Sequence, residues 1–206
     1  MSFIHFITDP KAIISTFGLI GVIAIIFLET GFFFGFFFPG DSLLFTAGLL
    51  ASGGYMNIAW LFLGAFVAAV VGDSVGYAFG RKVGPALFSR EDSLFFNRSN
   101  IQKAQSFYDT YGVKVIILAR FMPVIRTFAP IVAGVGSMKY RTFLTYNILG
   151  ALIWTGLMTG LGYGFGSTLT RMGIDPDKYL LPVIALIIVI SVLPAIREIF
   201  KKKPVV

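Results

Sequence analysis

Long apolar stretches alternate with short polar ones along the chain. Residues 12–28 carry no charge, Glu29 follows them, and a run rich in glycine and phenylalanine then leads to Pro39-Gly40-Asp41. A helix of about 20 apolar residues is long enough to cross the ~30 Å hydrocarbon core of a bilayer. The pattern therefore predicts an all-α, polytopic membrane protein.

Polar breaks divide this pattern into segments of one membrane domain, residues 1–206. Uninterrupted apolar runs are interpreted as spans, and runs interrupted by Pro and Gly as re-entrant hairpins that enter the membrane and return. The expected order is a lead at 1–11, a first span at 12–30, a hairpin at 31–52, a span at 58–80, a cytoplasmic loop with a surface helix at 81–112, a second hairpin at 113–137, spans at 143–166 and 179–196, and a basic cytoplasmic tail at 197–206.

The two predicted hairpins contain helix-breaking residues at membrane depth. Proline removes a backbone donor, and the backbone groups it frees must be satisfied by protein or water where no lipid can do so. A buried, broken element is therefore expected in each case. The predicted hairpin breakers are Pro39, Gly40, Pro123 and Pro130.

Basic residues are concentrated in three polar segments. Because cytoplasmic loops carry an excess of Lys and Arg, these segments are expected to be cytoplasmic. The three are the stretch 81–103, Lys139 with Arg141, and the C-terminal lysines. All three fall on one side in this layout, which predicts cytoplasmic N- and C-termini. The first hairpin then enters from outside and the second from inside.

An internal repeat relates the two hairpins. The segment Gly76–Gly80 matches Gly162–Gly166, 86 residues further along, and Ala47-Gly48 matches Ala133-Gly134 in the same register. Each half then comprises a hairpin and a span, with the second half inverted. Secondary transporters built from inverted repeats bind substrate near the bilayer midplane, at the repeat interface.

Composition narrows the functional classes. The chain is 56% hydrophobic and only 13% charged, it has no cysteine, and its single histidine, His5, lies near the N-terminus. Disulfides and thiolate metal sites are excluded, and we expect neither a metal nor another cofactor. The net charge of +7 is assigned to contact with anionic lipid headgroups rather than to nucleic acid.

Five charged residues lie within the apolar segments and are the candidate site. Charges at this depth are costly and usually face a protein interior or a water-filled cavity. Arginine's planar fork suits phosphate, so Arg120 and Arg126 are predicted to bind a lipid phosphate. Glu29, Asp41 and Asp73 are predicted to couple protons or gate the arginines, although Asp73 could simply position its span. The competing interpretation is that all five form structural ion pairs.

Two other features receive plainer interpretations. The glycines between Gly76 and Gly84 resemble a phosphate loop, but no strand precedes them, so close helix packing is expected. The aromatic residues of the spans are expected to be a mixture of interface anchors and packing residues; they include Trp60, Tyr140, Trp154 and Tyr179.

Four motifs together resemble the DedA family, also called SNARE-associated or VTT-domain proteins. The charged positions of the family pattern are all present. The motifs are Glu29 with Phe38-Pro39-Gly40-Asp41; Gly72-Asp73-Ser74-Val75-Gly76-Tyr77 with Gly80-Arg81; Arg120-Phe121-Met122-Pro123-Val124-Ile125-Arg126 with Ala133-Gly134 and Met138; and Phe143, Asn147, Gly150 and Trp154.

The resemblance implies a plasma-membrane protein with two facing re-entrant hairpins and a link to lipid translocation. Family members are associated with recycling undecaprenyl phosphate, with moving phospholipids such as phosphatidylethanolamine, and with dependence on the proton motive force. The family's essential acids correspond to Glu29 and Asp41, and its essential arginines to Arg120 and Arg126.

The leading hypothesis is a flippase that moves a phosphate-bearing lipid, with lipids and protons as its partners. The alternative is a proton/cation antiporter with indirect effects on envelope lipids. A membrane lipid phosphatase ranks last, because the spans offer no nucleophile beside a base, and we expect no enzyme activity. The sequence leaves open the lipid, the direction, the coupling and whether the chain forms a homo-oligomer.

Overall fold

The structure, a computed structural model, describes residues 10–31, 40–88, 112 and 114–174. Several predicted features lie wholly or mainly outside these residues: the lead at 1–11, Pro39, most of the loop at 81–112, the span at 179–196 and the tail at 197–206. All regular secondary structure in the described residues is helical, which confirms the all-α prediction.

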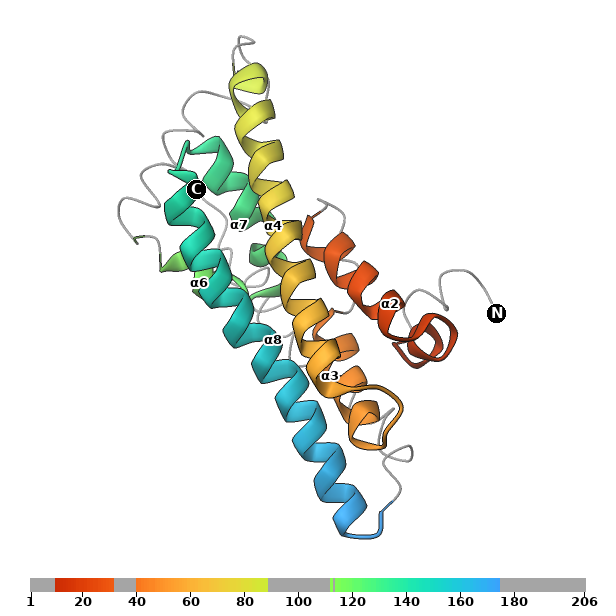
Figure 1. The fold of residues 1–206 in the computed structure, drawn as a ribbon. Helices are drawn as coiled ribbons and strands as arrows, with labels where there is room; N and C mark the ends of the chain where they lie inside the picture. The colour runs from red at the N-terminus through yellow and green to blue at the C-terminus, as the bar shows by residue number, and fades with distance from the viewer. Residues whose placement is uncertain (1–9, 32–39, 89–111, 113, 175–206) are drawn as a thin grey trace, which may run out of the picture.

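Six helices make up the described part of the chain (Figure 1). Two of them, α4 and α8, are long and apolar enough to cross a membrane, over Ile58–Val83 and Tyr140–Arg171. The helices are α2 (Pro10–Gly31), α3 (Gly40–Ser52), α4 (Ile58–Phe88), α6 (Val115–Ala119), α7 (Pro123–Val135) and α8 (Tyr140–Arg171).

Both long helices extend beyond the predicted spans. The predicted spans cover 58–80 and 143–166, whereas α4 continues to Phe88 and α8 runs from Tyr140 to Arg171. Charged side chains at the headgroup level are solvated without interrupting the helical hydrogen bonds. The first part of the predicted loop, 81–88, is therefore helical.

The first predicted span, 12–30, does not form one straight helix. Helix α2 is interrupted at Gly18, whose φ of 57° and ψ of −145° lie outside the helical region. Glycine adopts this conformation readily because it has no Cβ. An apolar helical segment, Thr16–Gly31, begins just before the kink and continues to the end of α2.

The stretch 113–137, predicted as the second hairpin, contains two helices that are separated before Pro123. Helix α6 ends at Ala119, Met122 is extended, and Pro123 begins α7. Proline is well suited to the first helical turn, where its missing N–H is not needed. Pro130, in contrast, lies inside α7, which continues to Val135, so this predicted breaker is wrong. Proline is tolerated inside helices that are packed among other helices, and Pro130 lies against Gly76 of α4.

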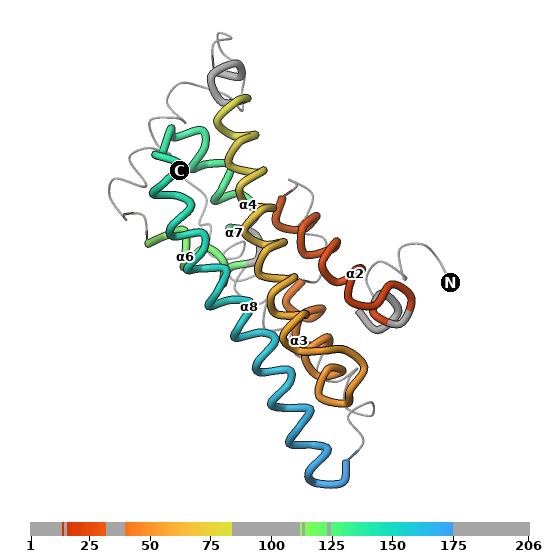
Figure 2. The backbone as a smooth tube through the Cα atoms, in the orientation of Figure 1, coloured from red at the N-terminus to blue at the C-terminus, as the bar shows by residue number. Residues whose placement is uncertain are grey.

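The short and long helices pair crosswise. Helix α3 packs mainly on α8, and α7 packs mainly on α4 (Figure 2). Glycines permit the close approach: a Cβ on Gly80 would overlap the Ile131 backbone, and a Cβ on Gly162 would overlap the Phe45 carbonyl. The same holds for Gly134 against α4 and Gly48 against α8. Close packing is thus confirmed for Gly80, whereas a Cβ on Gly76 would make an ordinary contact with Pro130 at 3.5 Å.

Apolar side chains lie on the outside of the long helices as well as inside. The main buried core joins residues of α2, α3, α4 and α8. Large apolar side chains are also exposed along α4 and α8, among them Trp60, Val67, Phe79, Leu152 and Leu161. An apolar exterior of this extent is what a helix presents to lipid.

Candidate functional site: a buried cluster of ion pairs

Arg126 of α7 lies between two carboxylates that come from other helices. Its Nη1 donates to Asp41 Oδ1 of α3 at 2.7 Å, and its Nη2 donates to Glu29 Oε1 of α2. Glu29 is fully buried, and Arg126 is 6% exposed. One guanidinium therefore joins α7 to α2 and α3, whose acids lie 97 and 85 residues earlier in the sequence.

Gly40 brings the first turn of α3 against the Glu29 carboxylate. A Cβ at this position would overlap the carboxylate oxygens. The N-terminus of a helix carries a partial positive charge from its free N–H groups, so it favours a carboxylate there. In the structure Gly40, which is predicted to be a hairpin breaker, is the residue that makes room for Glu29.

Trp154 of α8 completes the environment of Arg126. Its Nε1 donates to Asp41 Oδ1 at 2.8 Å, and its ring lies 4.9 Å from the guanidinium carbon of Arg126. A guanidinium over an indole face is an attractive cation–π arrangement. The side chain is 1% exposed, whereas Trp60 is 63% exposed. Trp154 is therefore a site residue, which the sequence had indicated only as an anchor or packing residue.

Arg120, which follows α6, has a separate set of partners. Its Nη2 pairs with Asp73 Oδ2 at 2.5 Å and donates to Asn147 Oδ1. Asn147 in turn donates its Nδ2–H to the Val70 carbonyl at 3.0 Å. Gly150 leaves space for the arginine stem, because a Cβ there would come within 2.9 Å of Arg120 Cδ.

A single face of α8 supplies the two site residues that the sequence reasoning did not assign. Phe143, Asn147, Gly150 and Trp154 follow the spacing i, i+4, i+7 and i+11, which places them on one face of a helix, and all four are buried. The signal was present, since these residues formed one of the motifs. A polar amide and a tryptophan on the buried stripe of a span point to hydrogen bonding inside the protein.

The two arginine clusters differ in charge balance. Arg120 faces one carboxylate, Asp73, together with the neutral amide of Asn147. Arg126 faces two carboxylates, Glu29 and Asp41. With all groups ionised, the first cluster is neutral and the second carries one surplus negative charge.

The guanidinium groups are not saturated by their partners. Within the described part of the chain, the Nε of Arg120 and the Nε of Arg126 are buried and have no hydrogen-bond partner. A buried donor without an acceptor carries a desolvation penalty of about 1–3 kcal/mol. Each arginine therefore retains capacity for another acceptor, such as a phosphate oxygen.

An apolar groove between α2 and α4 lies apart from these charges. It has a volume of about 470 Å³ and is lined by apolar residues, among them Ile23, Phe27, Trp60, Val67 and Val71. Phe27 and Val71 each stand two positions before an acid of the site, so they point to the opposite side of their helices. The groove is therefore no part of the ion-pair cluster.

The described residues contain no group of three or more His, Cys, Asp or Glu side chains that could hold a metal.

The described residues form helices with an apolar exterior and arginine–carboxylate pairs in the interior, which indicates a helical membrane protein. The chain matches the VTT domain over residues 38–164, a range that includes Asp41, Asp73, Arg120, Arg126, Asn147 and Trp154. The comparisons also show that it belongs to the DedA family of membrane proteins.

Relatives from distant bacteria share most of the chain. Protein DedA of Escherichia coli (strain K12) is 46% identical over 181 residues, covering 87% of this chain and 80% of the relative. The uncharacterized membrane protein ML0287 of Mycobacterium leprae is 39% identical over 188 residues, covering 91% and 82%. The uncharacterized membrane protein slr0232 of Synechocystis is 33% identical over 133 residues, covering 64% and 61%. No solved structure matches the chain.

Proposed function

We propose that this protein is a lipid transporter of the plasma membrane that moves a phosphate-bearing lipid across the bilayer, with dependence on the proton motive force. Undecaprenyl phosphate and a phospholipid such as phosphatidylethanolamine are the substrate classes that fit. The observation that carries the proposal is the position of Arg126, buried between Glu29 and Asp41 and stacked on Trp154.

Arg126 offers the chemistry that a phosphate headgroup requires. A guanidinium binds carboxylate and phosphate oxygens with the same fork of N–H donors, so a lipid phosphate can replace the carboxylates that hold Arg126 at rest. Such an exchange keeps the arginine paired at every stage. An arginine without a partner at this depth would have a much higher free energy than a paired one.

The excess of one negative charge beside Arg126 supports proton coupling. Two carboxylates share one guanidinium, so one negative charge has no counterpart within the cluster. Uptake of one proton by Glu29 or Asp41 neutralises that charge and weakens the hold on Arg126. Binding of phosphate and uptake of a proton would then favour each other, because both act on the same arginine.

Two inverted halves, each with a re-entrant hairpin, form the scaffold that we propose. Helices α3 and α7 have 13 residues each, about 20 Å of helix, which is short of the ~30 Å core. The crosswise pairing of α3 with α8 and of α7 with α4 is the arrangement expected of two related halves. Glycines related by the repeat, Gly48 and Gly134, make close contacts in both pairs.

In the proposed mechanism Arg120 has a different role from Arg126. Its partners Asp73 and Asn147 balance its charge and tie the break between α6 and α7 to α4 and α8. We propose that Arg120 mainly positions this break, so that Arg126, at the start of α7, points at Glu29 and Asp41. A direct contact of Arg120 with phosphate through its free Nε remains part of the proposal.

Reconstitution in liposomes tests the transport function. Purified protein should accelerate the flipping of a labelled polyprenyl phosphate or phospholipid, and Arg126→Ala should abolish that acceleration. Arg171→Ala, at the exposed end of α8, is the matched control and should flip at the wild-type rate. Unchanged flipping by a folded Arg126→Ala protein would refute the headgroup role.

The same surplus charge also favours a second candidate, a proton/cation antiporter. Proton flux in vesicles that lack the candidate lipids, lost in Asp41→Asn, would support that function over lipid transport. Release of inorganic phosphate from a polyprenyl phosphate would instead indicate a lipid phosphatase.

A further inference from the structure

A second polar site lies away from the ion-pair cluster, where the last turns of α4 meet the turn between α7 and α8. Arg81 Nη1 donates to the hydroxyl of Tyr77 at 2.9 Å, and this hydroxyl donates to the carbonyl of Met138. Tyrosine can make both bonds at once, since its hydroxyl is a donor and an acceptor. Arg81 is thereby held in a fixed direction although it is exposed.

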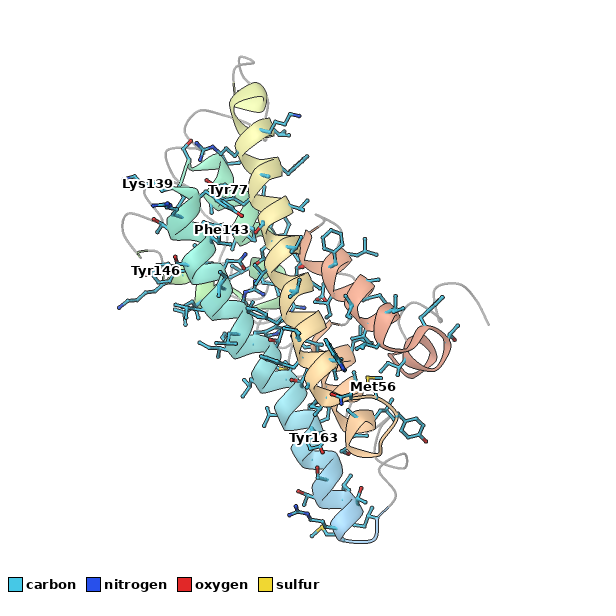
Figure 3. All side chains as sticks on the ribbon, in the orientation of Figure 1. Met56, Tyr77, Lys139, Phe143, Tyr146 and Tyr163 are labelled. Atoms are coloured by element: carbon cyan, nitrogen blue, oxygen red, sulfur yellow. The ribbon has the colours of Figure 1, made fainter. Side chains whose placement is uncertain are left out.

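The support beneath Arg81 consists of packed aromatic rings and a hydrogen-bonded turn. Tyr77 and Phe143 lie together between α4 and α8 (Figure 3), and their stacked rings have centroids 4.6 Å apart. The Tyr77 ring also lies 5.4 Å from the ring of Tyr140. The carbonyl of Met138 follows Ser137, whose φ of 54° is left-handed, and Met138 N donates to the Ala133 carbonyl at 3.1 Å. Side chains held in this way lose little freedom when they bind a ligand.

Four basic side chains lie at the end of the molecule where Arg81 is found, and no described carboxylate pairs with them. Lys82 follows Arg81 on α4, and Lys139 and Arg141 flank the start of α8; all four side chains are exposed. The described carboxylates are Glu29, Asp41 and Asp73, and each of them pairs with Arg120 or Arg126 in the interior. Within the described part of the chain, the group at this end therefore has no acidic partner.

The position of these four basic residues at the end of the α4 span corresponds to the expected depth of the lipid phosphates. The apolar span begins at Ile58, so Arg81 stands about 35 Å along the helix at ~1.5 Å per residue, at the edge of a ~30 Å core. Aromatic side chains such as Tyr140 are typical of this depth. An anion at this level is most readily supplied by a lipid headgroup.

We propose that Arg81, held by Tyr77, forms with Lys82, Lys139 and Arg141 a binding site for the phosphate of an anionic lipid in the adjacent leaflet. The site is distinct from the Arg126 cluster and does not depend on the proposed transport. Arg81 makes the directed contact, and the other three cations add attraction of the kind that basic residues exert on anionic headgroups.

Lipid binding to the full-length protein in detergent tests this site by native mass spectrometry. Phosphatidylglycerol should bind in preference to phosphatidylcholine, and Arg81→Gln should weaken phosphatidylglycerol binding about tenfold. Arg171→Gln removes the same charge at the other end of α8 and should change binding less than about twofold. Equal losses in the two variants would mean that net charge alone attracts the lipid, and the proposal would fail.

Tyr77→Phe separates a directed site from a diffuse positive surface. It keeps the ring stack and every charge but removes the hydroxyl that orients Arg81, so affinity should fall about threefold. Wild-type affinity in this variant would overturn the proposed role of Tyr77 and the built site with it. Inorganic phosphate at the same concentration should not displace the lipid, and displacement would show that free phosphate is the ligand.

Discussion

Asp41 and Trp154 are joined by a 2.8 Å hydrogen bond across 113 residues of sequence. The same carboxylate oxygen, Oδ1, accepts from Arg126 at 2.7 Å. Any event that removes Arg126 from Asp41 therefore leaves the carboxylate still held by the indole N–H. Trp154 would keep Asp41 in position if the ion pair opened, which is the property that the proposed exchange of partners by Arg126 requires.

Replacing Trp154 by Phe should expose this role. The variant retains an aromatic ring but loses the N–H donor, and a hydrogen bond to a charged group contributes about 1.5–3 kcal/mol. We expect lower unfolding free energy by about that amount and slower flipping in liposomes. Trp60→Phe, at an exposed position, is the control and should leave both measurements unchanged. Equal behaviour of the two variants would contradict a site role for Trp154.

Removal of Asp73 should be more harmful than removal of the whole Arg120–Asp73 pair. Asp73→Leu leaves a buried guanidinium without its carboxylate, which costs about 3–5 kcal/mol, whereas the double variant Asp73→Leu with Arg120→Met removes both charges. The double variant should therefore recover much of the lost stability, as measured by chemical unfolding in detergent. Flipping by a recovered double variant would show that Arg120 does not carry the lipid. Additive losses would contradict the pairing.

Gly40→Ala should disturb the site from its backbone side. The added Cβ would overlap the Glu29 carboxylate, so either α3 or Glu29 must move, and we expect a loss of about 1–3 kcal/mol together with slower flipping. Gly160→Ala is a matched control in a helix, because its Cβ meets nothing within 4 Å. The control should be neutral or slightly stabilising, since alanine favours helix more than glycine. Thermal unfolding of the two variants tests the contrast.

Asp41→Asn should uncouple transport from the proton gradient. The substitution removes the surplus negative charge beside Arg126 and leaves Glu29 as its single carboxylate. Flipping should then become insensitive to an imposed pH gradient, whereas wild-type flipping should fall when an ionophore dissipates it. A variant that keeps the wild-type response to the gradient would rule out Asp41 as the coupling acid.

The apolar runs by themselves determined that the chain is an all-α membrane protein, and the cost of burying charge singled out Glu29, Asp41, Asp73, Arg120 and Arg126. Both inferences rest on local chemistry: the length of an apolar run and the free energy of a charge in hydrocarbon. The break at Pro123 was equally local, because proline limits its own backbone and that of its neighbour.

Pairing was decided only by the tertiary structure. Which acid meets which arginine depends on how each helix is rotated and where it crosses its neighbours, and no local pattern encodes that. Glu29 and Asp41 meet Arg126, while Asp73 meets Arg120 with Asn147. Pro130 is tolerated inside α7, which packs on α4, and Trp154 joins the site because α3 packs on α8. These are contacts between distant residues, so they exist only once the helices are assembled.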